Sequence, residues 1–200
     1  MGELELLLAR HGQTDWNLER RWQGRSDVPL NPTGRQQAEG LGELLQAERL
    51  DRALMSPLLR ARETAQAVLE RRAGPPFELE PRLTEMDPGD WEGRYDRDLE
   101  DQAAYAAWQA DPIRSAPPGG ESGMDVARRV APFLDELAVS PRGGRILLVG
   151  HQFCLAILAC LVSGTPLSGV RSHFLASCEV KRMTLPLRRP QAPPHLPEPS

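Results

Sequence analysis

The sequence has little that would tie it to a membrane, a disulfide framework or a metal ion. Its apolar runs, those at 6–9 and 146–149 among them, are far shorter than the roughly 20 residues that cross a bilayer, and its N-terminus lacks a signal-peptide pattern. It has only three cysteines, and none forms a CxxC pair or a Cys/His set with metal-ligand spacing. We therefore expect a cytoplasmic protein with reduced cysteines, no bound metal and no membrane partner.

Charge of one sign is also scarce. The chain has 24 basic and 28 acidic residues, which gives a net charge of -4, and it has no basic block. Because a nucleic acid requires a basic surface, we expect no nucleic-acid partner. The 200 residues, 40% of them hydrophobic, suffice for one sizeable core, and this length favours a single domain.

In the first half of the chain, predicted strands alternate with predicted helices. Residues 3–9 are Leu-rich throughout, as in a strand that is buried on both faces. Asn31 followed by Pro32 is a helix start, and the helical spacing continues to about residue 48. The next predicted elements are a strand at 52–55, a helix at 58–72, a strand at 77–80, a loop at 86–93 and a helix at 96–109.

The second half continues the alternation and ends in a proline-rich tail. Ser122 and Asp125 fit a capping box that opens a helix to about residue 138. A strand at 145–149, a buried helix at 154–162 and an edge strand at 177–185 follow. Six prolines from Pro186 onward predict a disordered tail over 186–200 that cannot join a sheet. We thus expect one α/β domain over 1–185, a three-layer α/β/α sandwich with a mostly parallel central sheet.

Two histidines stand where such sheets place their sites. His11 follows the first strand, and His151 follows the strand at 145–149. Sites in parallel sheets lie beyond the carboxyl ends of the strands. A single histidine at such a place is more often structural. Two in matching contexts, one of them beside Arg10, indicate a reaction centre held by rigid elements.

Five short motifs occur in a fixed order: Arg10-His11-Gly12 with Asn17, Ser56-Pro57-Leu58-Leu59-Arg60-Ala61, Leu83-Thr84-Glu85 with Gly89, Trp91-Glu92-Gly93, and Gly150-His151. In these motifs the chain resembles the histidine phosphatase superfamily, specifically its phosphoglycerate mutase-like branch, over about residues 6–162. The other large branch carries RHGxRxP and a later His-Asp pair, where this chain has Gln13-Thr14-Asp15 and His151-Gln152. The resemblance implies a phosphoglycerate mutase-like fold.

The resemblance also implies a phosphohistidine mechanism that uses no metal or organic cofactor. In it, His11 is the nucleophile that becomes phosphorylated, His151 binds the phosphoryl group, and Glu85 is the general acid. Arginine forks hold two phosphate oxygens at once and keep their charge, which suits Arg10 and Arg60. The expected substrate-binding residues are Arg10, Asn17, Gln23, Gly24, Arg60 and Gln152.

Several of these residues have alternative interpretations. Arg60, taken alone, would most often be a surface charge on the first turn of a helix. The acid's role is open to three neighbours of Glu85, which are Asp87, Asp90 and Glu92. The tryptophans of the loops either line a pocket or pack in the core; they are Trp16, Trp22 and Trp91.

Members of this family either hydrolyse a phosphomonoester or move a phosphoryl group between substrate hydroxyls. Phosphoglycerate mutases carry a tyrosine three residues after the acid and an Arg-Arg pair after a tryptophan. This chain has Pro88 at the first position and, after Trp108, Gln109-Ala110 at the second. We therefore favour a phosphatase of a small phosphorylated metabolite over a cofactor-dependent phosphoglycerate mutase or a catalytically silent phospho-ligand-binding relative. Homodimers through an edge strand or a helix face are both compatible with the pattern.

Overall fold

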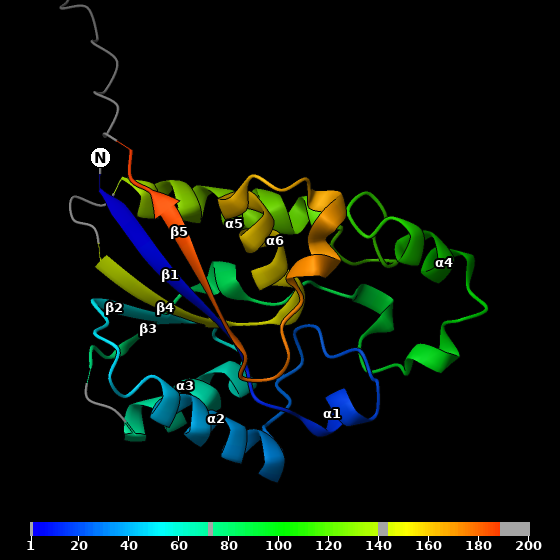
Figure 1. Ribbon diagram of the computed structural model, residues 1–200. Helices are drawn as coiled ribbons and strands as arrows, with labels where there is room; N and C mark the ends of the chain where they lie inside the picture. Colours follow the sequence, from blue (N-terminus) through cyan, green and yellow to red (C-terminus); the bar gives the residue numbers. More distant parts are fainter. Residues whose placement is uncertain (1, 72–73, 140–143, 189–200) are drawn as a thin grey trace, which may run out of the picture.

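The computed structural model describes residues 2–71, 74–139 and 144–188, in which a central sheet lies between two layers of helices (Figure 1). The strands are β1 Glu3–Arg10, β2 Arg52–Met55, β3 Phe77–Leu79, β4 Gly144–Gly150 and β5 Val180–Pro186. The α-helices are α1 Asp15–Leu18, α2 Pro32–Leu44, α3 Leu59–Arg71, α4 Ala103–Ala110, α5 Gly123–Ala138 and α6 Gln152–Ser163. The 3-10 helices are η1 Pro81–Leu83, η2 Gly89–Trp91, η3 Asp96–Asp98 and η4 Leu167–His173.

The sheet has the order β3-β2-β4-β1-β5, and every neighbouring pair is parallel except β1 with β5. Helices α5 and α6 cover one face and α2 and α3 the other (Figure 1). On β1, Leu6 and Leu8 pack with α5 and α6, whereas Leu7 and Ala9 pack with α2 and α3. Each leucine fully buried in this way contributes about 1.5–3 kcal/mol. The predicted sandwich and its strand buried on both faces are confirmed.

The predicted starts of α2 and α5 are confirmed by their caps. The Asn31 side chain accepts from the N–H of Gly34, and Pro32 follows at the first helical position. Ser122 and Asp125 form the predicted capping box of α5. Helix α2 ends at Leu44, earlier than predicted, because the chain then turns through a hydrogen bond from the N–H of Gln46 to the carbonyl of Glu43.

The single helix predicted at 96–109 is wrong. The segment divides into η3 and α4, because Leu99 turns inward and is fully buried while Gln102 takes extended backbone angles as the cap of α4. The predicted loop at 86–93 contains η2. Helix α6 begins at Gln152, two residues before the predicted start.

The C-terminal strand is also displaced from its predicted range. It starts at Val180 rather than 177, because Glu179 and Ala176 close a turn through two hydrogen bonds. It includes Pro186, which pairs with Glu3, so the prediction that Pro186 stays out of the sheet is wrong. A proline is tolerated at the end of an edge strand, where a ladder N–H is not required. The rest of the predicted tail, from residue 189, lies outside the described residues.

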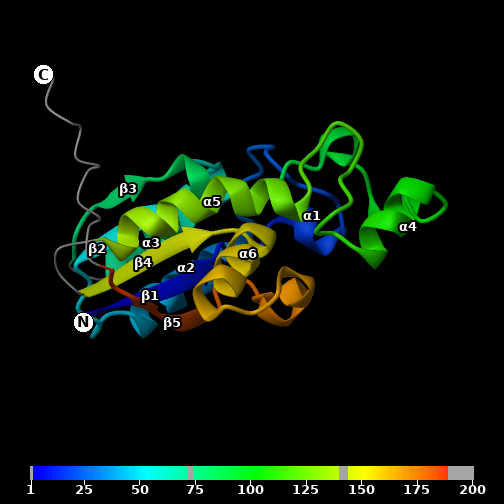
Figure 2. The ribbon, with the colours of Figure 1, turned by 90° about the horizontal axis from the view of Figure 1, so that it is seen from above.

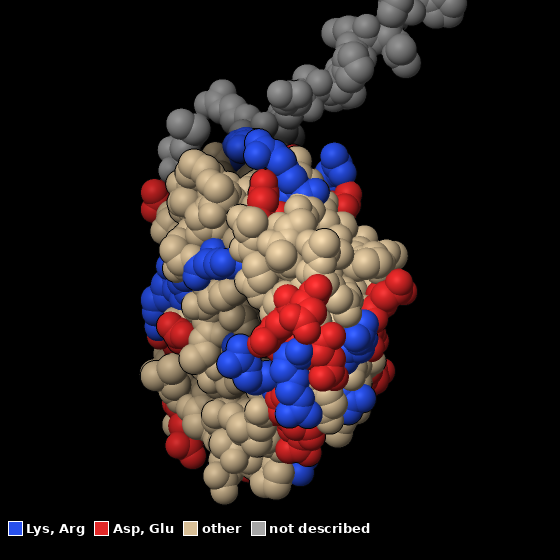
Figure 3. Space-filling view, turned by 90° about the vertical axis from the view of Figure 1, so that its right-hand side faces the viewer, with Lys and Arg blue, Asp and Glu red and all other residues tan. Residues whose placement is uncertain are grey.

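The carboxyl ends of β1, β2 and β4 point to the end of the molecule that carries α1 and α4 (Figure 2). Basic and acidic side chains are interspersed on that end, and neither sign dominates it (Figure 3). Within the described ranges, no single helix is long and apolar enough to span a membrane; the bent pair α6 and η4 meets that test by length and composition only.

Candidate active site

The strand register brings the two predicted histidines together. Arg10 at the end of β1 pairs with Gly150 at the end of β4, so His11 and His151 leave adjacent strands at the same level. The backbone N–H of His11 donates to the carbonyl of Gly150 at 3.0 Å. The two imidazole ring centres lie 5.1 Å apart. The prediction that each histidine follows the carboxyl end of a strand is confirmed, and the pairing of β1 with β4 is what makes the two neighbours.

His11 presents an unprotonated ring nitrogen. Its Nδ1 lies 2.7 Å from the Gly12 carbonyl, which can only accept, so Nδ1 carries the ring proton. Nε2 then keeps its lone pair and accepts from the Nε–H of Arg60 at 3.3 Å. Burial lowers the pKa of His11 well below its usual value, and the charges of Arg60 and Arg10 lower it further. At neutral pH the ring is therefore neutral, with Nε2 available as a nucleophile.

Arg60 is buried, only 1% exposed, so the surface-charge interpretation is wrong. Its two terminal nitrogens donate to the carbonyls of Ser26 and Gly24, each at 2.8 Å. Burial lowers the pKa of Arg60 to about 10, so it stays charged at pH 7. Gly24 has φ +47°, and a Cβ there would lie 2.1 Å from Cδ of Pro88. Besides lining the cavity, Gly24 thus supplies a carbonyl that anchors Arg60.

His151 caps α6 and is fully buried. Its Nε2 lies 2.7 Å from Oγ of Ser56, and that oxygen already accepts from the N–H of Leu58. Donation of the Ser56 hydroxyl proton to Nε2 satisfies all three groups and leaves the ring proton of His151 on Nδ1. This Nδ1 has no hydrogen-bond partner among the described residues. Burial, reinforced by Arg60, lowers the pKa of His151, so it is a neutral donor.

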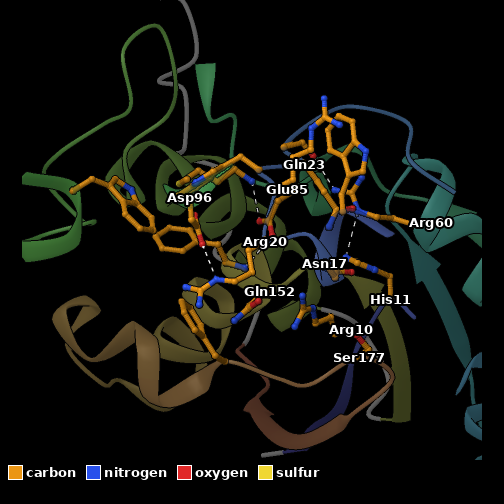
Figure 4. Close-up of a pocket in the computed structure, with 18 residues that line it drawn as sticks. Arg10, His11, Asn17, Arg20, Gln23, Arg60, Glu85, Asp96, Gln152 and Ser177 are labelled. Carbon is orange, nitrogen blue, oxygen red and sulfur yellow. Dashed lines mark hydrogen bonds and ion pairs between the residues drawn. The ribbon is translucent and has the colours of Figure 1, made fainter. Parts of the chain in front are cut away.

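The remaining polar groups are also held in place. Arg10 donates to the carbonyl of Leu175 at 2.8 Å, and its buried Nε finds no partner in the described part of the chain. Asn17 accepts from the N–H of Thr14 through Oδ1 at 3.0 Å, and Gln23 accepts from the Thr14 hydroxyl at 2.9 Å. Because these amide oxygens are engaged, the NH₂ groups are the ends that a ligand can meet. Donors therefore predominate around His11 (Figure 4).

These side chains line a cavity of about 420 Å³. Eight of the nine predicted site residues line it, and the ninth, His151, is fully buried beside His11. The eight are Arg10, His11, Asn17, Gln23, Gly24, Arg60, Glu85 and Gln152.

The outer part of the cavity, away from His11, holds residues that the sequence did not assign: Arg20, Arg21, Met86, Asp96, Trp108, Phe153 and Phe174. Ser177, which was not assigned either, lies beside Arg10 (Figure 4). They come from segments that meet only in the folded chain. Of the three tryptophans that were open between pocket and core, Trp16 and Trp22 line the cavity. Trp91 is fully buried and packs edge-on against Tyr105.

Glu85 lies at the N-terminus of α6. One carboxylate oxygen accepts from the N–H groups of Met86 at 2.9 Å and Cys154 at 3.0 Å, and the other from that of Phe153 at 3.1 Å. Phe153 and Cys154 belong to the first turn of α6, whose unpaired N–H groups favour an anion. The carboxylate is thus fixed at the wall of the cavity.

The three competing acids face elsewhere. Asp87, Asp90 and Glu92 are absent from the residues that line the cavity. Asp87 pairs with Arg25 at 3.3 Å, and Glu92 accepts from the backbone N–H of Arg25 at 3.2 Å. The geometry favours Glu85 over these neighbours.

No group of three or more His, Cys, Asp or Glu side chains in the described ranges is arranged to hold a metal ion. Of the four arginines that line the cavity, Arg10 and Arg60 are the ones whose guanidinium charges act on His11, at the inner end of the cavity.

The two buried neutral histidines predict a fall in stability with acidification. In the unfolded chain each has a pKa near 6.5. The folded pKa values are lower, so below pH 6.5 the unfolded state binds protons that the folded state excludes. We expect the free energy of unfolding to fall between pH 7.5 and pH 5.0 by up to about 4 kcal/mol, measured by urea denaturation. His151→Gln should lose about half of this dependence, and a flat profile for the native chain would contradict the assignment.

Comparison with known families agrees with the site. The family model of the histidine phosphatase superfamily (branch 1) matches residues 6–192. The chain is 39% identical over 173 residues to the adenosylcobalamin/alpha-ribazole phosphatase of Salmonella typhimurium, a match that covers 86% of this chain and 85% of that protein. It is 34% identical over 184 residues to a protein of Enterobacter sp. named "probable phosphoglycerate mutase", covering 90% and 84% of the two chains.

Solved structures show the same fold. The mycobacterial glucosyl-3-phosphoglycerate phosphatase, solved in complex with VO3, superposes with a TM-score of 0.81 and 31% identity over 90% of this chain and 92% of that one. The relatives therefore carry the names of both phosphatases and a mutase, so their names alone leave the choice between the two reactions open.

Proposed function

The chain belongs to the histidine phosphatase superfamily, branch 1, and we propose that it hydrolyses the phosphomonoester of a small metabolite through a phosphohistidine at His11. The observation that carries this proposal is the unprotonated Nε2 of His11 in contact with the guanidinium of Arg60 at the inner end of the cavity. A neutral nucleophile beside a fixed cation is what attack on a phosphate dianion requires.

The first step forms a P–N bond and breaks the ester P–O bond. Nε2 of His11 attacks phosphorus, and Arg10, Arg60 and the Nδ1–H of His151 bind the three equatorial oxygens, on which the charge is spread. Asn17 adds its NH₂ group. The departing ester oxygen takes a proton from the carboxyl of Glu85, which must enter this step protonated.

The second step returns the enzyme to its starting state. Water attacks the phosphohistidine, its proton passes to the carboxylate of Glu85, and the P–N bond breaks as phosphate forms. Nε2 of His11 regains its lone pair. Glu85 thus acts as acid in one step and as base in the next, and the reaction needs no metal ion.

The outer cavity favours hydrolysis over mutase activity. In a mutase, a phosphoglycerate binds to an enzyme that already carries a phosphohistidine. Its carboxylate and its own phosphate, the second in the site, then need unpaired cations. Of the two outer arginines, Arg20 pairs with Asp96 at 3.4 Å. Arg21 lies 3.9 Å from a carboxylate oxygen of Glu19 and over the ring of Trp16 at 4.2 Å. Both outer arginines thus already have a carboxylate partner, so the cavity suits a leaving group without a second anion.

The experiment that tests this function measures phosphate release from a panel of phosphomonoesters, including 3-phosphoglycerate with and without 2,3-bisphosphoglycerate. Isomerisation is followed in the same samples. We expect release of phosphate without isomerisation, before and after dialysis against EDTA. Isomerisation without release would establish a mutase, and no reaction in any sample would indicate a silent binding protein. Activity lost to EDTA and restored by a metal would contradict the metal-free mechanism.

Glu85→Gln tests the general acid. The amide cannot donate the proton that an alkoxide needs, whereas p-nitrophenolate departs without one. We expect kcat/KM to fall about 10²–10⁴-fold for an alkyl phosphate and less than about 3-fold for p-nitrophenyl phosphate. Glu92→Gln, a substitution outside the cavity lining, is the control. Equal losses on both esters in Glu85→Gln would move the acid's role to another residue.

Three expectations from the sequence stay predictions: a cytoplasmic location, the absence of a nucleic-acid partner, and a homodimer.

A further inference from the structure

The backbone that carries Glu85 is held from α5 by one arginine. Arg129 donates from the same terminal nitrogen to the carbonyl of Arg82 at 2.7 Å and to that of Thr84 at 2.9 Å. Arg82 and Thr84 flank Leu83, and Thr84 directly precedes Glu85. The side chain of Arg129 is 18% exposed, and its position is therefore fixed by packing as well as by hydrogen bonds.

A second side chain holds the other end of the same segment. Glu121 accepts one hydrogen bond from each of the two remaining nitrogens of Arg129, at 3.2 Å and 3.1 Å, as a two-point ion pair. The same carboxylate accepts from the backbone N–H of Asp87 at 3.0 Å, and the Glu121 N–H donates to the Asp87 carbonyl at 2.8 Å. Arg25 lies 3.3 Å from Glu121 and 3.3 Å from Asp87. The pair thus forms hydrogen bonds with the backbone on both sides of Glu85.

We propose that Arg129 and Glu121 are positioning residues for proton transfer by Glu85, an inference that rests on the proposed function. The N–H groups of Phe153 and Cys154 orient the carboxylate, whereas the Arg129–Glu121 pair fixes the backbone from which that carboxylate extends. Neither member of the pair is among the cavity-lining residues, so both act through Glu85 and not on the substrate.

The chemistry makes this positioning consequential. A general acid must reach the ester oxygen within hydrogen-bond distance, and a shift of about 1 Å at a reacting group can reduce the rate about 10²-fold. The inner end of the cavity has anchors of its own, because Arg60 is held by Ser26 and Gly24 and Arg10 by Leu175. The ion pair of Glu121 with Arg25, which joins the pair to the Gly24–Ser26 loop, does not involve Arg129. Loss of the pair should therefore impair proton transfer while phosphoryl binding is retained.

The test compares leaving groups in Arg129→Met and Arg129→Lys. We expect kcat/KM for glycerol 2-phosphate to fall about 10–100-fold in Arg129→Met, with less than about 3-fold change for p-nitrophenyl phosphate. Arg129→Lys keeps the charge but cannot hold two carbonyls and a carboxylate together, so it should be intermediate. Arg128→Met is the matched control, because the Arg128 side chain is 70% exposed and, among the residues that the structure describes, pairs only with Asp125 on the same helix.

The outcomes separate the inference from a general structural role. In a Glu85→Gln background, Arg129→Met should cause no further loss on glycerol 2-phosphate, because the acid is already absent. Equal losses on both esters, or additive losses in the double variant, would overturn the positioning role. If Arg129→Met does not fold, Arg129→Lys gives the same ratio test. If the native chain hydrolyses both esters and the ratio of their kcat/KM values is unchanged in the variants, the positioning role alone is overturned. If the native chain hydrolyses neither ester, the proposed function is overturned as well.

Discussion

His11→Ala is expected to abolish turnover, with kcat/KM reduced at least about 10⁴-fold for every ester, p-nitrophenyl phosphate included. The reason is that Nε2 of His11 is the atom that forms the bond to phosphorus, and no general acid or better leaving group can replace it. The phosphoenzyme should disappear as well. To measure it, the enzyme is incubated with ³²P-labelled substrate and the reaction is quenched. The label bound to the protein is then tested for the acid lability and alkali stability of a phosphohistidine.

His173→Ala is the matched control for this experiment, since that ring lies in η4 against Lys181 and outside the cavity lining. It should keep both activity and label. Because removal of a buried ring destabilises the fold, unfolding of His11→Ala is measured in parallel, and His11→Gln serves as a better-filled second variant. Persistent label in either His11 variant would transfer the nucleophile's role to His151, the ring 5.1 Å away.

The inner site was predictable because its residues are adjacent in sequence to strands that sequence also predicts. His11 follows a run of leucines whose burial on both faces is plain from composition, and His151 follows another such run. A parallel sheet places both strand ends at one edge whatever the helices do. The phosphate-binding role of Arg60 was implied only by family resemblance, and its burial was not predictable, because its anchors, the carbonyls of Ser26 and Gly24, lie in a loop without regular pattern.

The outer part of the cavity was not predictable, because its residues are not adjacent in sequence to those strands. Trp108 reaches the cavity from α4 and Phe174 from the end of η4, and no local spacing connects these elements. The division of 96–109 depends on the burial of Leu99 in the core cluster that contains Trp91, Tyr105 and Trp108. This is a tertiary effect that overrides helical spacing. Pro186 joins the sheet because its place at the end of an edge strand requires no N–H, and composition does not reveal that place.

Arg60→Met and Arg60→Lys are expected to separate the two contributions of this residue, its fork and its charge. Arg60 holds two carbonyls and the Nε2 of His11 simultaneously, and a lysine ammonium cannot reproduce that planar arrangement. We expect kcat/KM to fall about 10²–10³-fold in Arg60→Lys and about 10³–10⁴-fold in Arg60→Met, for which the phosphoryl charge also loses its counter-ion. Phosphate release from p-nitrophenyl phosphate measures both.

The pH profile gives the sharper result. The charge of Arg60 is one of the causes that lower the pKa of His11, so its removal raises that pKa toward the usual value. In Arg60→Met a larger share of His11 is protonated in weak acid, and the acid limb of kcat/KM should move to higher pH. Arg60→Lys keeps a charge and should shift less. Because the substrate's own ionisation is the same throughout, the difference between variants belongs to the enzyme. An acid limb that stays fixed in Arg60→Met, with unfolding at pH 7.5 showing an intact fold, would mean that desolvation and Arg10 keep His11 neutral without Arg60.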